Sequence, residues 1–263
     1  MLNPLSNATM YGKGVFTTLV FADSAPLYWE MHASRLAADA ARIGLEIPDL
    51  ALIQRELKDV VRRCGHPGGR ARVTISDPNT ARIWSAGSDM RPFVSIVTGK
   101  HRTLPQAFRL TISDFAVNSR SPLAGVKSCN YLENLMALDA ARSDGFDEAL
   151  RLNERGEIAG AACANVFWIK NGRLFTPGVA TGCLAGTTRA LILSEFEVEQ
   201  VAHGIDAIRN ADAVILTSAG IGAKRATFEN GLLAANDVAD NLIRRIAELY
   251  QLSDQNSIQS VGE

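Results

Sequence analysis

Apolar and polar residues in the first half of the chain recur with two different periods. The segment from Gly14 to Phe21 is rich in β-branched and aromatic residues, which predicts a buried strand. From Glu30 to Ile43 the apolar positions return every three to four residues, which predicts a helix, and a second helix is expected from Leu50 to Arg63. Three more strands are expected at 72–76, 93–97 and 109–113. This half is therefore predicted to be an α+β unit in which strands outnumber helices.

The second half also mixes strands and helices. The turn Lys170-Asn171-Gly172-Arg173 is a strong hairpin signal. The polar segment Val117–Pro122 holds a proline that disfavours helix, so it is interpreted as a linker. We expect a small domain at 1–116, a linker at 117–124 and a larger domain at 125–263. The elements expected in the larger domain are helices at 131–142, 187–196 and 237–250 and strands at 148–152, 165–169, 173–176 and 213–216.

The composition of the chain excludes several classes of protein, but it does not identify a reaction. The chain is 47% hydrophobic and 21% charged, with a formal net charge of -1, so neither a nucleic-acid partner nor a membrane surface is expected. No apolar run is long enough to span a bilayer, and the N-terminus lacks the pattern of a signal peptide. The cysteines are scattered, which argues against a metal site and a disulfide framework and for a cytoplasmic protein. They are Cys64, Cys129, Cys163 and Cys183.

Two segments carry the chemistry that the sequence suggests. Lys127 lies in the apolar, glycine-bounded stretch Pro122–Tyr131, and a lysine that burial holds uncharged is a nucleophile for Schiff-base formation. The stretch Gly182–Arg189 is a glycine turn that runs into a helix capped by threonine, and such a turn binds anions. A surface lysine and a plain helix cap are the simpler alternatives. Together, a group for an aldehyde and a group for a phosphate suggest pyridoxal phosphate.

Seven short motifs, in this order, resemble the class IV aminotransferase family. These pyridoxal-phosphate enzymes of fold type IV include branched-chain and D-amino-acid aminotransferases and 4-amino-4-deoxychorismate lyase. The resemblance implies a small α/β N-terminal domain, a larger, mixed β-barrel-like domain with flanking helices that binds the cofactor, and a homodimer. The motifs are Tyr11-Gly12-Lys13-Gly14-Val15-Phe16, His32-Ala33-Ser34-Arg35-Leu36, Lys127-Ser128-Cys129-Asn130-Tyr131-Leu132, Asp147-Glu148-Ala149-Leu150, Asn165-Val166-Phe167, Thr176-Pro177 and Gly186-Thr187-Thr188-Arg189.

The resemblance also implies roles for single residues. Lys127 would form the Schiff base with pyridoxal 5′-phosphate and later move the proton between the substrate Cα and the cofactor. Arg35 would bind the cofactor phosphate, and Tyr131 would lie beside the phenolic oxygen. Asn165 belongs with the cofactor-binding residues, and Ser218 is a further candidate phosphate donor. The phosphate-binding turn would be made by Gly186, Thr187 and Thr188.

One position departs from the family pattern. Where the family carries a glutamate that pairs with the pyridine nitrogen, this chain has Gly160, and Glu157 is expected to face the other side of its strand. The glutamate keeps the ring nitrogen protonated, so its absence predicts a less stable carbanion and slower chemistry. The loss of such a bond costs roughly 1.5–3 kcal/mol, or about one to two powers of ten in rate.

Three functions that use pyridoxal phosphate remain open on the sequence, and a fourth alternative is an unrelated α+β binding domain in which Lys127 forms no adduct. The first is an aminotransferase that passes an amino group between an amino acid and a 2-oxo acid. The second is 4-amino-4-deoxychorismate lyase, because the spacing from Lys127 to Asn130 resembles the corresponding spacing in that enzyme. The third is a pyridoxal-phosphate-binding protein weakened in catalysis by Gly160. Arg82 is a candidate ligand for a substrate carboxylate, and no metal is expected.

Overall fold

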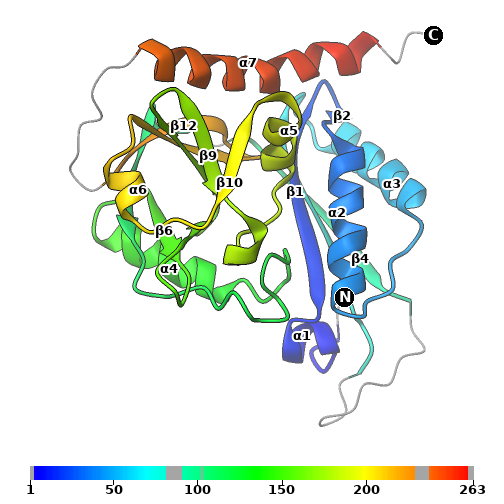
Figure 1. Ribbon diagram of the computed structural model, residues 1–263. Helices are drawn as coiled ribbons and strands as arrows, with labels where there is room; N and C mark the ends of the chain where they lie inside the picture. The colour runs from blue at the N-terminus through cyan, green and yellow to red at the C-terminus, as the bar shows by residue number, and fades with distance from the viewer. Residues whose placement is uncertain (1–2, 81–90, 102, 229–236, 260–263) are drawn as a thin grey trace. The chain divides into compact units, whose positions relative to one another are not determined.

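The computed structural model describes residues 3–80, 91–101, 103–228 and 237–259 (Figure 1). The chain divides into two compact units. The first comprises Met1–Arg102 and Val126–Tyr131, and the second Thr103–Gly125 and Leu132–Glu263. Among the described residues, no helix combines the length and the hydropathy that a bilayer crossing requires.

The first unit is a four-stranded antiparallel sheet covered on one face by two helices (Figure 1). Its core joins inward-facing residues of the two long central strands to the apolar stripes of both helices, with Leu19, Leu36 and Leu57 almost fully buried. Its elements are α1 (Asn7–Tyr11), β1 (Gly14–Ala22), β2 (Ala25–Pro26), α2 (Trp29–Arg42), α3 (Leu50–Arg63), β3 (Gly69–Ser76) and β4 (Phe93–Gly99), with strand order β2-β1-β3-β4.

The second unit is built on a mixed sheet of eight strands. Phe108 and Trp168 belong to one apolar cluster, and Phe167 and Ile192 to another. The strands are β5 (Ala107–Ile112), β6 (Glu148–Leu152), β7 (Ile158–Ala161), β8 (Asn165–Lys170), β9 (Arg173–Pro177), β10 (Val198–Val201), β11 (Ala213–Ser218) and β12 (Gly222–Phe228), in the order β10-β9-β8-β11-β12-β5-β6-β7. The helices are α4 (Leu132–Ser143), η1 (Val179–Thr181), α5 (Thr187–Glu195), α6 (Asp206–Arg209) and α7 (Asp237–Gln259).

The two ends of this sheet approach each other. Strand β7 forms one edge, and the Ile158 N–H donates to the His203 carbonyl at 2.8 Å, just beyond β10 at the other edge. The sheet is therefore strongly curled, because the right-handed twist of its strands accumulates across it. The expected α+β architecture with a barrel-like second domain is confirmed.

The observed limits of the two units differ from the domain boundaries that we expected at 116 and 125. Strand β5 pairs in parallel with β12 and β6, so it belongs to the eight-stranded sheet and not to the small domain. Val126–Tyr131 belongs to the first unit, where Ser128 forms a bridge with Val15 of β1. These pairings are long-range, which is why a linker signal in the sequence did not locate them.

Candidate active site

Lys127 lies on a short extended segment that runs beside β1. The Phe16 N–H donates to the Lys127 carbonyl at 2.9 Å, which fixes the backbone of the segment. Lys127 Nζ lies 4.6 Å from the ring centroid of Phe16 and 4.7 Å from that of Tyr131, and it donates to the Tyr131 hydroxyl at 3.5 Å. The two rings touch edge to face, with centroids 5.2 Å apart. The amine therefore lies against two aromatic rings, next to a phenol with which it can exchange a proton.

Arg35 is held by a chain of two further side chains. Its Nη2 donates to Thr17 Oγ1 at 2.6 Å, and this oxygen lies 2.6 Å from His32 Nδ1. Burial lowers the pKa of His32 to about 3, and the positive charges of Arg35 and Lys127 act in the same direction. A neutral His32 can accept a hydrogen bond from the Thr17 hydroxyl at Nδ1, while the Thr17 oxygen accepts from Arg35 Nη2.

One donor of Arg35 is left over. Its Nε is buried and has no hydrogen-bond partner among the residues that the structure describes. Unsatisfied buried donors are costly, and a guanidinium that is fixed in place binds oxyanions well. The first unit thus presents an amine at Lys127 and an incompletely bonded cation at Arg35.

A second arginine on the first unit was not among the predicted site residues. Arg72 is paired with Thr18 across β1 and β3, so it shares a face of the sheet with Phe16. Its guanidinium carbon lies 3.7 Å from the centroid of the Phe16 ring, and its Nε donates to Thr74 Oγ1 at 3.2 Å. Strand alternation against Phe16 is the sequence signal that could have identified Arg72. The predicted carboxylate ligand, Arg82, lies outside the described residues.

In the second unit, the start of α5 is shaped to receive an anion. Its N-cap is Gly186, which offers no side-chain cap, and the Ala190 N–H is bonded to the Gly186 carbonyl. Thr187 and Thr188 follow in the first turn, both buried, and Thr188 Oγ1 has no hydrogen-bond partner within the described part of the chain. The N–H groups and the dipole of a helix N-terminus favour negative charge at this place.

Asn165 shapes this turn from the neighbouring strand. Its Nδ2 donates to the Leu184 carbonyl at 2.8 Å, and its Oδ1 occupies the place where a β-carbon on Gly186 would lie. A larger residue at 186 would require the Asn165 side chain to move. Asn165 pairs across the sheet with Thr217, whose fully buried Oγ1 also lacks a partner among the described residues.

The predicted donor Ser218 is the next residue along β11 and is only half-buried. Strand alternation sends neighbouring side chains to opposite faces, so Thr217 rather than Ser218 shares the face of Asn165. Ser218 stays a prediction, and the strand register adds Thr217 as a second candidate hydroxyl group.

The backbone at Gly160 suits glycine. Its φ is 131°, a value that side-chain-bearing residues rarely adopt, although a β-carbon would have 3.5 Å to its nearest neighbour. Its partner across β6 and β7 is the buried Arg151, which donates to the Phe115 carbonyl at 3.2 Å and to Glu133 at 3.3 Å. Conformation, more than space, therefore opposes a glutamate at this position.

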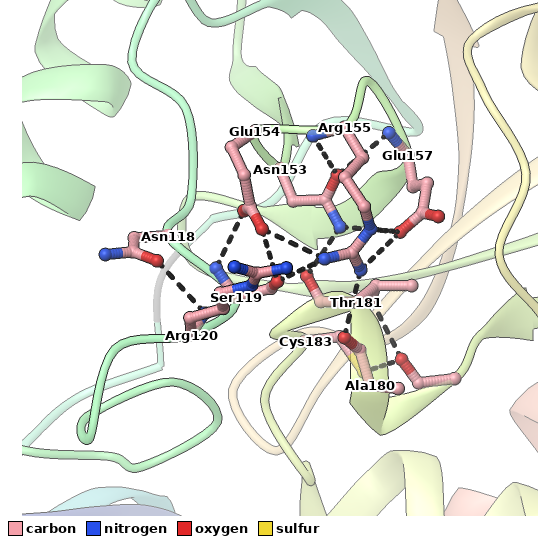
Figure 2. Close-up of polar contacts among 11 residues, drawn as sticks. Asn118, Ser119, Arg120, Asn153, Glu154, Arg155, Glu157, Ala180, Thr181 and Cys183 are labelled. Atoms are coloured by element: carbon pink, nitrogen blue, oxygen red, sulfur yellow. Dashed lines mark hydrogen bonds and ion pairs between the residues drawn. The ribbon is translucent and has the colours of Figure 1, made fainter.

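Glu157 is engaged in a separate polar cluster (Figure 2). Its carboxylate accepts from Arg155 Nη2 at 2.6 Å and from Asn153 Nδ2 at 2.8 Å, and both bonds lower its pKa. Glu154 accepts from the N–H and the hydroxyl of Ser119, so the cluster fastens the segment before Lys127 to the β6–β7 turn. With its carboxylate bonded here, Glu157 does not replace the missing glutamate.

Each unit by itself offers groups that suit part of a phosphorylated aldehyde. In the first unit, Arg35 Nε is a buried donor with no hydrogen-bond partner among the described residues, and the Lys127 amine is a partner for a carbonyl carbon. In the second unit, the Thr188 and Thr217 hydroxyl groups are also buried and have no partner in the described part of the chain, and phosphate oxygens accept from such donors.

Comparisons with known proteins agree on the family. The family model described as amino-transferase class IV matches residues 14–227. Aminodeoxychorismate lyase of Bacillus subtilis is 26% identical over 235 residues, 83% of this chain and 78% of the lyase. A putative branched-chain-amino-acid aminotransferase of Methanocaldococcus jannaschii is 28% identical over 193 residues, 70% of this chain and 65% of that protein. The crystal structure of a putative 4-amino-4-deoxychorismate lyase from Legionella pneumophila has a TM-score of 0.86 at 25% identity and covers 95% of both chains.

The family match begins at the first residue of β1 and ends in β12, so it spans most of both units. The relatives include aminotransferases and lyases, at identities too low to choose between the two. The chain is therefore a member of the class IV aminotransferase family.

Proposed function

We propose that this chain is a pyridoxal 5′-phosphate-dependent aminotransferase that moves an amino group between an amino acid and a 2-oxo acid. The observation that carries the proposal is the placement of the Lys127 amine against Phe16 and Tyr131, in the same unit as Arg35 with its unsatisfied Nε. When bound, the cofactor supplies an electrophilic aldehyde and an electron sink for the charge that develops at the substrate Cα.

We assign a separate role in this reaction to each of several residues. Lys127 would hold the cofactor through its aldehyde carbon, and its amine would be the base that takes up and returns the proton at the substrate Cα. The Tyr131 hydroxyl, which accepts a hydrogen bond from the Lys127 amine, orients that amine. In the first unit, Arg35 would bind phosphate oxygens, and in the second unit the first turn of α5, with Thr188, would do so. Arg72 is assigned to a substrate carboxylate, because it is an oriented guanidinium on the face of β1 that carries Phe16.

The lyase is the second candidate, and a specific observation favours it. Two of the relatives described above, from Bacillus subtilis and Legionella pneumophila, are lyases or putative lyases, and both align over most of the chain. A lyase would use the same lysine to release pyruvate from aminodeoxychorismate. The third candidate is a binding protein with weakened catalysis, which Gly160 supports because no carboxylate is provided at that position.

A product assay separates these candidates. The purified protein with pyridoxal 5′-phosphate is given a panel of amino acids with 2-oxoglutarate, and separately aminodeoxychorismate, and the new amino acid or pyruvate is measured. Transfer of an amino group that disappears in Lys127→Ala but persists in Lys58→Ala supports the aminotransferase. Lysine 58 is the matched control because it is exposed on α3. Pyruvate release alone would replace the aminotransferase by the lyase, and cofactor binding without either product would leave the binding protein.

A further inference from the structure

Helix α2 turns three polar residues toward β1 and the Lys127 segment. His32, Arg35 and Asp39 follow each other at spacings of three and four, which places them on one helix face. His32 is 2% exposed and Asp39 is 5% exposed. His32 contacts Thr17 on β1, and Asp39 reaches the Lys127 segment.

Asp39 contacts the backbone of Lys127 directly. The Lys127 N–H donates to Asp39 Oδ2 at 3.1 Å, and the two residues are 88 positions apart in sequence. On the other side, the Lys127 carbonyl accepts the Phe16 N–H at 2.9 Å. The peptide groups that flank the Lys127 α-carbon are therefore held between α2 and β1, which restricts the direction in which its side chain leaves the backbone.

The carboxylate itself is a costly group to bury. Burial raises the pKa of Asp39, while the Lys127 N–H and the charges of Arg35, Arg42 and Lys127 counteract that rise. The hydrogen bond from the Lys127 N–H offsets part of the cost of burying this acceptor. The carboxylate also comes one helical turn after Arg35, so a single rigid helix sets both the guanidinium and the lysine backbone.

We propose that Asp39 is a positioning residue that holds Lys127 at the correct separation from Arg35 for the covalent capture of a phosphorylated aldehyde. The separation of phosphate and carbonyl in such a ligand is fixed by its own bonds, so the protein must match it. In the capture, the Lys127 amine adds to the carbonyl carbon and the carbonyl oxygen leaves as water, with no oxidation or reduction. This inference rests on the proposed function, because it requires Lys127 to be the nucleophile.

The test compares capture with phosphate binding. Asp39→Leu keeps the side-chain shape and removes both acceptor oxygens, Asp39→Asn keeps one, and Asp39→Ala is a second removal should leucine not be accommodated. Asp59→Leu and Asp59→Asn on the exposed surface of α3 are the matched controls. Pyridoxal 5′-phosphate capture is followed by absorbance and by the mass of the borohydride-reduced adduct, and inorganic phosphate affinity is measured by calorimetry.

We expect Asp39→Leu to slow capture by about tenfold to a hundredfold, as the loss of a bond to a charged acceptor predicts, with phosphate affinity within about twofold of the parent. Asp39→Asn and both Asp59 variants should stay within about threefold in both measurements.

Three results would overturn the inference. The first is capture by Asp39→Leu and Asp39→Ala at the parent rate. The second is a parallel loss of phosphate affinity, which would indicate a merely structural role. The third is a slow Asp39→Asn, since that variant keeps an acceptor. If the parent protein forms no adduct at Lys127, the proposed function and this inference are both refuted. If the parent forms the adduct and the Asp39 variants form it equally fast, only this inference is refuted.

Discussion

At the scale of single residues, burial sets the protonation of a carboxyl group close to Gly160. Glu148 is 4% exposed, and burial raises its pKa to about 7 although backbone N–H groups counteract the rise. Both of its oxygens lie 3.3 Å from the Cys163 N–H, in the turn that follows β7. The carboxyl group thus ties β6 to the segment that carries Gly160.

This raised pKa predicts how stability changes with pH. The folded state holds the Glu148 proton more tightly than the unfolded state, so its contribution is fully present below pH 4.5 and is lost as pH rises toward 7. The free energy of unfolding of the parent, relative to Glu148→Gln, should fall by roughly 3 kcal/mol across this window. Denaturant titrations of both proteins at pH 5 and pH 8 check it, and an unchanged difference would contradict it.

A hydroxyl group with no partner predicts opposite effects on stability and binding. Thr188→Val removes the buried Oγ1 that is unsatisfied in the described structure, so the melting temperature without ligand should stay level or rise. The gain in melting temperature on adding pyridoxal 5′-phosphate should shrink, because one phosphate donor is gone. Differential scanning fluorimetry measures both. A large loss of stability without ligand would mean that the hydroxyl has an internal partner.

At the scale of elements, the backbone of strand β7 includes one residue, Gly160, whose φ favours glycine. Gly160→Ala should destabilise the fold by about 1–3 kcal/mol, because its φ of 131° disfavours any side chain. Gly99→Ala in β4 is the control, since an added β-carbon there meets nothing within 4 Å. Gly160→Glu should be destabilised as well and should not gain turnover. Chemical denaturation measures the free energy of unfolding of both variants. An equal change in the two would show that the backbone at residue 160 can adopt another conformation at little cost.

The regular elements were readable from the sequence because they depend on local patterns. Helices α2 and α3 follow their apolar spacing, and the turn at Asn171 and Gly172 has the positive φ values that this pair favours. Strands β10 and β12 were missed, because neither has a clear alternating pattern and both are stabilised by distant partners.

The site residues were readable only in part. Short motifs predict Lys127 and Arg35 as site residues, and these roles stay predictions. The contacts of Thr17, Asp39 and Arg72 depend on how α2 and β3 pack against β1, and no local signal encodes that packing. Thr217 is a candidate beside Ser218 for the same reason, because its facing depends on the strand register.

At the scale of the whole molecule, the family resemblance predicts assembly. We expect a homodimer, because the family places its sites at a dimer interface. Light scattering coupled to size-exclusion chromatography at micromolar concentration should return about twice the chain mass of 28.3 kDa. A mass equal to one chain would contradict this expectation.

The central claim is that Lys127 forms a covalent bond with pyridoxal 5′-phosphate. The most direct measurement is the visible absorption spectrum of the purified protein with the cofactor, beside Lys127→Ala and the control Lys58→Ala. We expect an absorption band in the parent and in the Lys58 variant that is absent from Lys127→Ala and that changes when the amino-acid donor is added. A spectrum of free cofactor in all three proteins would refute a covalent bond at Lys127.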